Sequence, residues 1–260
     1  MQPKVRFMRE REHRTVRKWG DRMYCFESRV RYSEINSAKE LTLPSLLDYL
    51  QDCCTFESGE LGIGVDYLAR EQRAWILSSW QLKIAEYPLL GEKIRICTWP
   101  YGFKGFYGYR NFLVEDARGN TLVEANSVWV FLDTGRMRPV RIPEEMLKAY
   151  EGGFDDPLPG EWEDRRIPFS GEGDRREPVQ VSRFHIDTNH HMNNGKYILV
   201  AEEYLPEDFV AAGLRAEYRR AALQGNLLFP CVCRGDDRVT VGLLDEEGKP
   251  YAVVQFVRKD

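Results

Sequence analysis

The chain has 260 residues, of which 43% are hydrophobic and 30% charged, so we expect a globular protein with at least one sizeable core. Its formal net charge of −4 argues against a nucleic-acid binder with a basic face. No apolar run approaches the roughly 20 residues that a membrane helix needs, so we expect no membrane insertion and a cytoplasmic location.

The chain opens with a basic extension, residues 1–23, ahead of a domain predicted over residues 24–150. The segment YCFESRVRYSEI has strand composition and is followed by a long helix. Several segments rich in β-branched and aromatic residues come next, separated by turns such as LLGE and PYGFKG. This order predicts an antiparallel sheet wrapped around one long helix.

The long helix is marked by its start signals and by its spacing. Thr42 is a candidate N-cap, and Pro44 lies in the first turn. Residues that recur every three or four positions share one face, and this face is apolar except for Glu57.

The six cysteines lie in predicted strands and in the helix, and none forms a CxxC motif. We therefore expect buried, reduced thiols. The six are Cys25, Cys53, Cys54, Cys97, Cys231 and Cys233.

Residues 151–178 are rich in Gly, Pro and charge without periodicity, which predicts a linker. The strand and helix order then restarts in a second predicted domain, residues 179–260. The two halves are weakly similar at a spacing of roughly 150 residues, which indicates duplication of one domain. The predicted alignment of the two helix entrances places Glu34, Ile35, Asn36 and Ala38 over Asp187, Thr188, Asn189 and His191.

The second helix entrance, DTNHHMNNGKY, concentrates polar side chains ahead of an apolar helical run. Asp187, Asn189 and His191 alternate, so in an extended segment they point the same way. Together they can orient and deprotonate a water, while the amides at the helix start polarise a carbonyl. This predicts hydrolytic chemistry. The alternative is a hydrogen-bonded polar turn without chemistry.

Other readings of this stretch are weaker. A metal site would use His185, His190, His191 and Asp187, but neighbouring side chains in an extended run point apart and no downstream His or CxxC completes a shell. No GxSxG elbow occurs and no cysteine lies in the motif, so we expect no covalent nucleophile. We predict neither a metal nor a cofactor.

The same stretch resembles the D-x-N-x-H-x-N-N-x-x-Y signature of acyl-acyl carrier protein (acyl-ACP) thioesterases of the bacterial type. Segments of the first half, including LGIG, YPLLGEKIRICTWP and SVWVFLDTGRMRPVRIP, are similar in order and spacing to that family. The resemblance implies an α+β tandem hotdog fold. It also implies hydrolysis of fatty acyl-ACP to free fatty acid and ACP, which terminates fatty acid synthesis.

The resemblance also implies roles for single residues. Asp187, Asn189 and His191 match the family's catalytic positions. The first half would hold the acyl chain in a tunnel lined partly by residues 43–59 and by the strand around Trp80. The positions expected to support the site are Asn193, Asn194 and Tyr197, and one of the two asparagines is also the expected helix cap.

One departure from the family pattern affects the mechanism. The family strand E-Y-R-R-E-C reads EYRRAA here, so Ala221 and Ala222 replace a carboxylate and a cysteine. Strand spacing leaves Glu217 about 13 Å from Ala221, too far to substitute simply. Either Asp187 suffices with its neighbours, or the protein is a weakened enzyme or an acyl-ACP-binding module. Glu57 could also supply the missing carboxylate, unless it is a helix-end residue that reaches water.

Acyl carrier proteins are acidic, so a docking patch should be basic. An acyl-CoA thioesterase could use the same arginines for phosphates, so both substrates stay open. The resemblance favours a homodimer. The candidate docking residues are Arg215, Arg219, Arg220 and Lys196.

Overall fold

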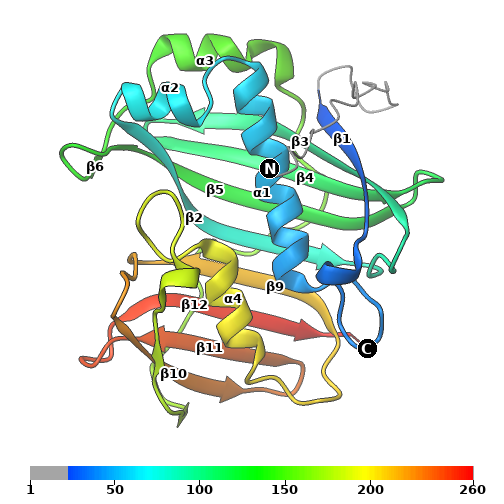
Figure 1. Ribbon diagram of the computed structural model, residues 1–260, viewed down its shortest axis with the longest axis vertical. Coiled ribbons are helices and arrows are strands. Elements are labelled where there is room, and N and C mark those ends of the chain that lie inside the picture. The colour runs from blue at the N-terminus through cyan, green and yellow to red at the C-terminus, as the bar shows by residue number, and fades with distance from the viewer. Residues whose placement is uncertain (1–22, 260) are drawn as a thin grey trace, which may run out of the picture.

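Residues 23–259 are described by a computed structural model, in which 12 strands form one antiparallel sheet (Figure 1). Two helices, α1 and α4, lie against one face of this sheet (Figure 1). The predicted basic extension lies outside the described residues, apart from Met23.

The elements follow in two series along the chain. The first series is β1 (Tyr24–Arg29), η1 (Tyr32–Glu34), α1 (Leu43–Glu60), α2 (Val65–Arg70), β2 (Arg73–Ile84), β3 (Lys93–Lys104), β4 (Tyr107–Asp116), β5 (Thr121–Asp133), β6 (Arg138–Pro139), α3 (Glu144–Tyr150) and η2 (Glu151–Gly153). The second is β7 (Asp174–Arg175), β8 (Val179–Gln180), η3 (Arg183–His185), α4 (Asn194–Glu202), β9 (Ala211–Tyr218), β10 (Leu227–Arg234), β11 (Arg238–Leu244) and β12 (Pro250–Arg258).

Both halves of the sheet have the same strand order. Counted outward from the centre, the first half runs β2-β5-β4-β3-β1 and the second runs β9-β12-β11-β10-β7. The central pair, β2 and β9, is hydrogen-bonded from Ser79 opposite Glu217 to Lys83 opposite Gly213. The predicted α+β architecture, with an antiparallel sheet around a long helix, is confirmed, and the repeated order is what duplication predicts.

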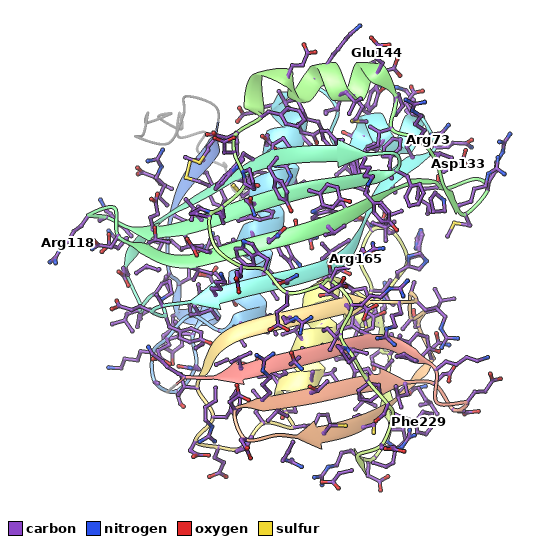
Figure 2. All side chains as sticks on the ribbon, turned by 180° about the vertical axis from the view of Figure 1, so that it is seen from behind. Arg73, Arg118, Asp133, Glu144, Arg165 and Phe229 are labelled. Carbon is purple, nitrogen blue, oxygen red and sulfur yellow. A yellow bond between two sulfur atoms is a disulfide. The ribbon has the colours of Figure 1, made fainter. Side chains whose placement is uncertain are left out.

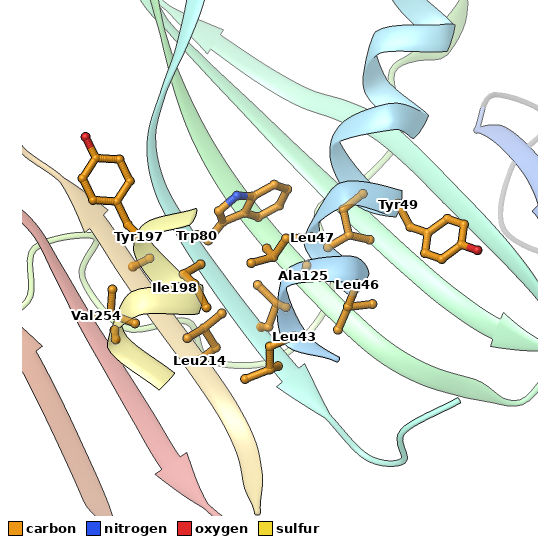
Figure 3. Packing of buried hydrophobic residues seen from close by; sticks show 14 of the residues in the cluster. Leu43, Leu46, Leu47, Tyr49, Trp80, Ala125, Tyr197, Ile198, Leu214 and Val254 are labelled. Carbon is orange, nitrogen blue, oxygen red and sulfur yellow. The ribbon is translucent and has the colours of Figure 1, made fainter. Parts of the chain in front are cut away.

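Helix α1 begins where the capping residue and the proline in the sequence predict its start. The hydroxyl of Thr42 accepts the N–H of Ser45 at 3.4 Å, and Pro44 lies in the first turn. Its leucines point toward the sheet, and Trp80 of β2 lies between α1 and α4 (Figure 3). The inner face of α4 packs Ile198 near β9 and β12 (Figure 3). Within the described part of the chain, no helix has both the length and the apolar character to cross a membrane.

The predicted linker crosses the face of the sheet opposite to α1 and α4 (Figure 2). Sheet side chains that point away from the helices bind its backbone: Trp99 Nε1 donates to the carbonyl oxygen of Asp156 at 2.9 Å, and Gln81 Nε2 to that of Glu163 at 2.7 Å. Strand β7, within the predicted linker, pairs with β10. The domain boundaries at residues 150 and 179 stay predictions.

Two cysteines form a disulfide. Cys25 in β1 lies directly opposite Cys97 in β3, with 4.1 Å between their Cα atoms. The expectation of reduced thiols is wrong for this pair, because facing positions of antiparallel strands bring two side chains within bonding reach. The free thiols are Cys53, Cys54, Cys231 and Cys233.

Candidate active site

The loop before α4 is a tight turn, not the extended run expected from the sequence. The N–H of Asp187 donates to the carbonyl oxygen of His191 at 2.9 Å, and the N–H of His190 donates to that of Asp187 at 3.1 Å. The carboxylate of Asp187 accepts the N–H of Asn189 at 2.8 Å. An aspartate that binds the N–H two residues on stabilises a turn, so the prediction of an extended segment is wrong.

The turn nevertheless gathers the three predicted catalytic side chains. Asp187, Asn189 and His191 line one cavity of about 170 Å³. Four residues line both this cavity and a larger one of about 620 Å³: Trp75, Asp187, Asn189 and Asn194. The polar loop therefore lies at the boundary between two cavities.

The first turn of α4 contributes to the same place. Asn193 is the N-cap, and its side-chain oxygen accepts the N–H of Gly195 at 2.9 Å, which confirms that one of the two asparagines is a cap. Asn194 is the first helical residue and lines both cavities. Unpaired N–H groups and a partial positive charge at a helix start favour an anion there.

Two tyrosines hold the loop and the chain after β9 together. The Tyr197 hydroxyl accepts the N–H of Ala222 at 2.8 Å, and the N–H of Met192 donates to the carbonyl oxygen of Ala222 at 2.9 Å. The Tyr218 hydroxyl donates to the carbonyl oxygen of Asn194 at 3.0 Å. Burial raises the pKa of Tyr197 to about 12, so it stays protonated.

The position of the missing carboxylate lies in this site. Ala221 lines the smaller cavity, and Asp187 is the one acidic residue among the described residues that line it. Strand β9 ends at Tyr218, so Ala221 lies outside the strand, and the alternation of side-chain directions expected for EYRRAA does not extend to it. The carboxylate of Glu217 accepts the N–H of Ile167 at 2.9 Å, which ties it to the linker.

The larger cavity is lined mostly by the first half, from α1, α2 and the strands, and by the loop before α4. Aromatic side chains form much of its wall: Trp75, Phe103, Tyr109 and Trp129. Sequence reasoning missed these residues, because aromatic residues in strands predict an ordinary core equally well.

Helix α1 also brings two carboxyl groups toward the loop. Burial raises the pKa of Asp48, and it raises that of Asp52 with a further contribution from Asp48. Asp52 lines the larger cavity together with Asp187. The signal that could have found them is an acidic pair at i and i+4 on a predicted helix.

Two predicted support residues lie away from the walls of both cavities. Trp80 is 1% exposed and packs against Phe112, with 5.0 Å between the rings. Glu57 is 4% exposed and forms a buried ion pair with Arg110. Glu57 therefore neither reaches water nor replaces the missing carboxylate at the loop.

The four candidate docking residues separate into two groups. The guanidinium of Arg215 is buried under the linker and donates to the carboxylate of Glu163 at 2.6 Å, so it is not accessible to a partner. Arg219 and Arg220 are exposed and line the smaller cavity. Lys196, partly exposed, lies in the first turn of α4.

A histidine and a cysteine near the loop, His185 and Cys54, are both buried. The Nδ1 atom of buried His185 accepts the N–H of Ser182 at 2.9 Å, and burial lowers its pKa. In the described part of the chain, no group of three or more His, Cys, Asp or Glu could hold a metal ion. Cys54 lines the larger cavity, and burial raises its pKa to about 11, which favours the unreactive thiol.

A loop with the same hydrogen bonds precedes α1. The N–H of Asn36 donates to the carbonyl oxygen of Glu40 at 2.9 Å, and the N–H of Lys39 donates to that of Asn36 at 3.0 Å. Asn36 therefore corresponds to Asp187, and Glu40 to His191. The predicted alignment of the two loops is wrong by two positions, because it followed the identity of the residues and not the turn.

Comparison with known proteins gives consistent matches. Residues 21–150 match the model of the acyl-ACP thioesterase N-terminal domain, and residues 171–219 match that of the C-terminal domain. The chloroplastic acyl-[acyl-carrier-protein] hydrolase FATB2 of Cuphea viscosissima is 27% identical over 207 residues, 74% of this chain and 50% of that protein. The chloroplastic palmitoyl-acyl carrier protein thioesterase of Arabidopsis thaliana is 27% identical over 215 residues, 76% of this chain and 52% of that protein. The chain spans about half the length of these curated relatives.

Solved structures share the fold. An acyl-ACP thioesterase from Bacteroides thetaiotaomicron superimposes with a TM-score of 0.82 at 20% identity, covering 91% of this chain and 98% of that chain. The 12:0-ACP thioesterase from Umbellularia californica gives 0.81 at 18% identity, covering 91% and 97%. These structures confirm the tandem hotdog fold. Since the two family models together match more than half of the 260 residues, the chain belongs to the acyl-ACP thioesterase family.

Proposed function

We propose that the protein hydrolyses fatty acyl-ACP to a free fatty acid and ACP, and so terminates fatty acid synthesis. The observation that carries this proposal is the convergence of Asp187, Asn189 and His191 on a small cavity that adjoins a much larger one. The polar groups suit hydrolysis, and the larger cavity has room for an acyl chain. Family membership supports the same activity.

Thioester hydrolysis requires a water that is oriented and deprotonated as it attacks. Asp187 and His191 are the proposed proton acceptors, and Asn189 orients the water or the thioester carbonyl. The water oxygen bonds to the carbonyl carbon, and the bond between carbon and sulfur breaks. The proton taken from water goes to the leaving sulfur, so the products are a fatty acid and the carrier thiol.

Negative charge develops on the carbonyl oxygen during the attack. In this proposal the partial positive charge at the N-terminus of α4, where Asn194 lines both cavities, stabilises this negative charge. A preorganised donor of this kind is worth about 10²- to 10³-fold in rate. In this proposal, the cap of Asn193 and the bond from Ala222 to Tyr197 keep the helix start in place.

Ala221 favours a second candidate function, an acyl-ACP-binding module or a weakened enzyme. It lines the smaller cavity where the family pattern has a carboxylate. In our main proposal Asp187 and His191 suffice, since both line this cavity and a single positioned general base contributes about 10²- to 10⁴-fold.

We propose that the carrier protein docks beside the smaller cavity. Arg219 and Arg220 line that cavity, and Lys196 lies in the adjoining turn of α4, so all three suit an acidic partner. Arg215 is left out because it is buried. Acyl-CoA could use the same arginines for its phosphates. The homodimeric state and the cytoplasmic location stay predictions.

The test is hydrolysis of acyl-ACP and acyl-CoA thioesters of short to long chains by the wild type and by Asp187→Asn. Asparagine keeps an oxygen for the N–H of Asn189, so we expect the turn to persist and turnover to fall about 10²-fold or more. Asp116→Asn is the matched control, because Asp116 accepts the N–H of Arg118 at 2.8 Å in a similar turn far from the site.

The outcomes separate the candidates. Near-normal turnover by Asp187→Asn would reject the role of Asp187. If the wild type hydrolysed no thioester but bound acyl-ACP, the binding module would be the correct function. Faster turnover of acyl-CoA than of acyl-ACP would identify the alternative substrate.

A further inference from the structure

One wall of the larger cavity is charged, although the cavity is proposed to hold an alkyl chain. Arg110 of β4 lines this cavity and forms an ion pair with Glu57 of α1. It also donates to the hydroxyl of Thr98 at 3.1 Å, and its guanidinium lies 5.4 Å from the ring centre of Tyr150. The Tyr150 hydroxyl is 3.1 Å from that of Ser58, which also lines the cavity.

This polar cluster lies far from the catalytic loop. Arg110 is opposite Ser127 in β5, which is opposite Trp80 in β2. The smaller cavity is lined by β2 at Ile76. The separation is therefore two strand spacings, about 10 Å, across the sheet and about 13 Å along the strand. An acyl chain whose thioester lies at the loop would bring only its distal part to Arg110.

The guanidinium has donors that the ion pair does not use. Within residues 23–259, both hydrogen bonds of the Arg110 side chain leave from Nη1, toward Glu57 and Thr98. Arginine also carries N–H groups on Nη2 and Nε. Its side chain is 8% exposed and lines the cavity, so a bound molecule can reach it. Burial alone would lower the pKa of Arg110, but the carboxylate of Glu57 raises it above its usual range, so the side chain stays charged.

We propose that the cavity accepts an acyl chain with a hydroxyl or keto oxygen in its distal part, and that Arg110 donates a hydrogen bond to this oxygen. The inference rests on the proposed function, since the acyl chain must lie in the larger cavity. A plain alkyl chain would cover the N–H groups of Arg110 without giving them a partner, which is unfavourable. A distal carboxylate fits less well, because Glu57 already balances the charge of the guanidinium.

Calorimetry with amide analogues of dodecanoyl-pantetheine tests the proposal. One analogue carries the plain chain, and the others carry a hydroxyl moved along the chain one carbon at a time. We expect one distal position to bind about tenfold or more tightly than the plain chain, the effect of a hydrogen bond to a charged donor. If no hydroxylated analogue binds more tightly than the plain chain, or if none of the analogues binds, the proposal is wrong.

A double variant tests the assignment to Arg110. Glu57→Leu with Arg110→Met removes both charges, so no lone charge is left buried. We expect it to lose the preference for the hydroxylated chain. A preference that survived would assign the hydroxyl to another group and overturn the proposal. If the double variant does not fold, the binding of the plain and hydroxylated analogues to the wild type still tests the proposal.

Two controls complete the experiment. Arg73 lines the same cavity but is more exposed and pairs with Asp133 at 3.0 Å (Figure 2), so Arg73→Met should keep the preference. Asp187→Asn should keep it as well, because the readout is binding. A protein that hydrolyses nothing but still prefers the hydroxylated chain would therefore contradict the proposed function and not this inference.

Discussion

The loops that precede α1 and α4 have the same backbone but different side chains. Each loop has five residues, 36–40 and 187–191, and the N–H of the first donates to the carbonyl oxygen of the fifth. The side-chain oxygen of the first residue accepts the N–H of the third: Asn36 from Ala38 at 2.9 Å, and Asp187 from Asn189 at 2.8 Å. Only the second loop lines either of the two cavities. The backbone turn therefore serves the fold, and the chemistry depends on which side chains it carries and on what lies in front of it.

The largest effect should come from giving the second loop the side chains of the first. We expect the triple variant Asp187→Asn, Asn189→Ala and His191→Glu to lose turnover about 10²- to 10⁴-fold, because it removes the proposed base and its partners. Groups that act as a unit are not additive, so the triple variant should be little worse than Asp187→Asn. Single-turnover rates of thioester hydrolysis measure this.

The reverse exchange is the control for that experiment. Giving the first loop the side chains of the second, by Asn36→Asp, Ala38→Asn and Glu40→His, should leave the rate unchanged, because this loop lines neither cavity. A rate increase would show that the first loop can also form a catalytic site, although it lines neither cavity.

A gain of activity should follow from Ala221→Glu. Ala221 lines the cavity with Asp187 and is exposed, so a glutamate has room and restores the carboxylate of the family pattern. We expect kcat to rise about tenfold or more. Leu223→Glu is the matched control, because Leu223 is exposed in the same segment but lines neither cavity. An unchanged kcat in both variants would mean that the site works without this group.

When the two loops are aligned with Asn36 on Asp187, Glu202 of α4 corresponds to Gln51 of α1, so the two helices also differ at this position. Burial, with Glu203, raises the pKa of Glu202 to about 7 from 4.5. Wild-type stability should therefore fall as pH rises from about 4.5 to about 7, because the unfolded chain releases this proton first. Glu202→Gln removes that loss.

The measurement is the free energy of unfolding in urea across this pH range. We expect the gain of Glu202→Gln over wild type to grow by about 2 kcal/mol from low to neutral pH, less than the full shift implies because the side chain keeps some contact with water. A gain independent of pH would show that Glu202 is not the titrating group.

The smallest effect concerns the fourth residue of each loop, which has a left-handed backbone: Lys39 with φ 67° and His190 with φ 61°. Glycine adopts this conformation without strain, although it costs more entropy on folding. We expect Lys39→Gly and His190→Gly each to raise Tm by about 2 °C, as measured by calorimetry. Turnover should not change. A lower Tm for one variant only would show that the two turns are not equivalent.

The fold could be predicted because its signals are local. Thr42 and Pro44 mark the start of α1, and the alternation in EKIRICT correctly buries Ile94 and Ile96. The disulfide could not be predicted, since it depends on the register that brings Cys25 opposite Cys97.

The candidate site was predictable in its residues but not in its geometry. Asp187 forms a turn because its side chain binds the backbone, and this preference overrides the alternating pattern. Trp75 and Arg110 come from separate strands, so their place in the wall of the cavity that the loop also lines depends on sheet order, and no spacing along the chain reveals it. Arg215 is buried because of the path of the linker, which has no periodic signal.

The pairing of β2 with β9 has a consequence for how the halves could diverge. Because both strands belong to one chain, the contact between the halves forms intramolecularly and does not weaken on dilution. Two identical subunits would have to change both copies of the loop at once. A single chain can mutate one copy and keep the other, so one half is free to specialise in holding substrate while the other retains the reactive groups.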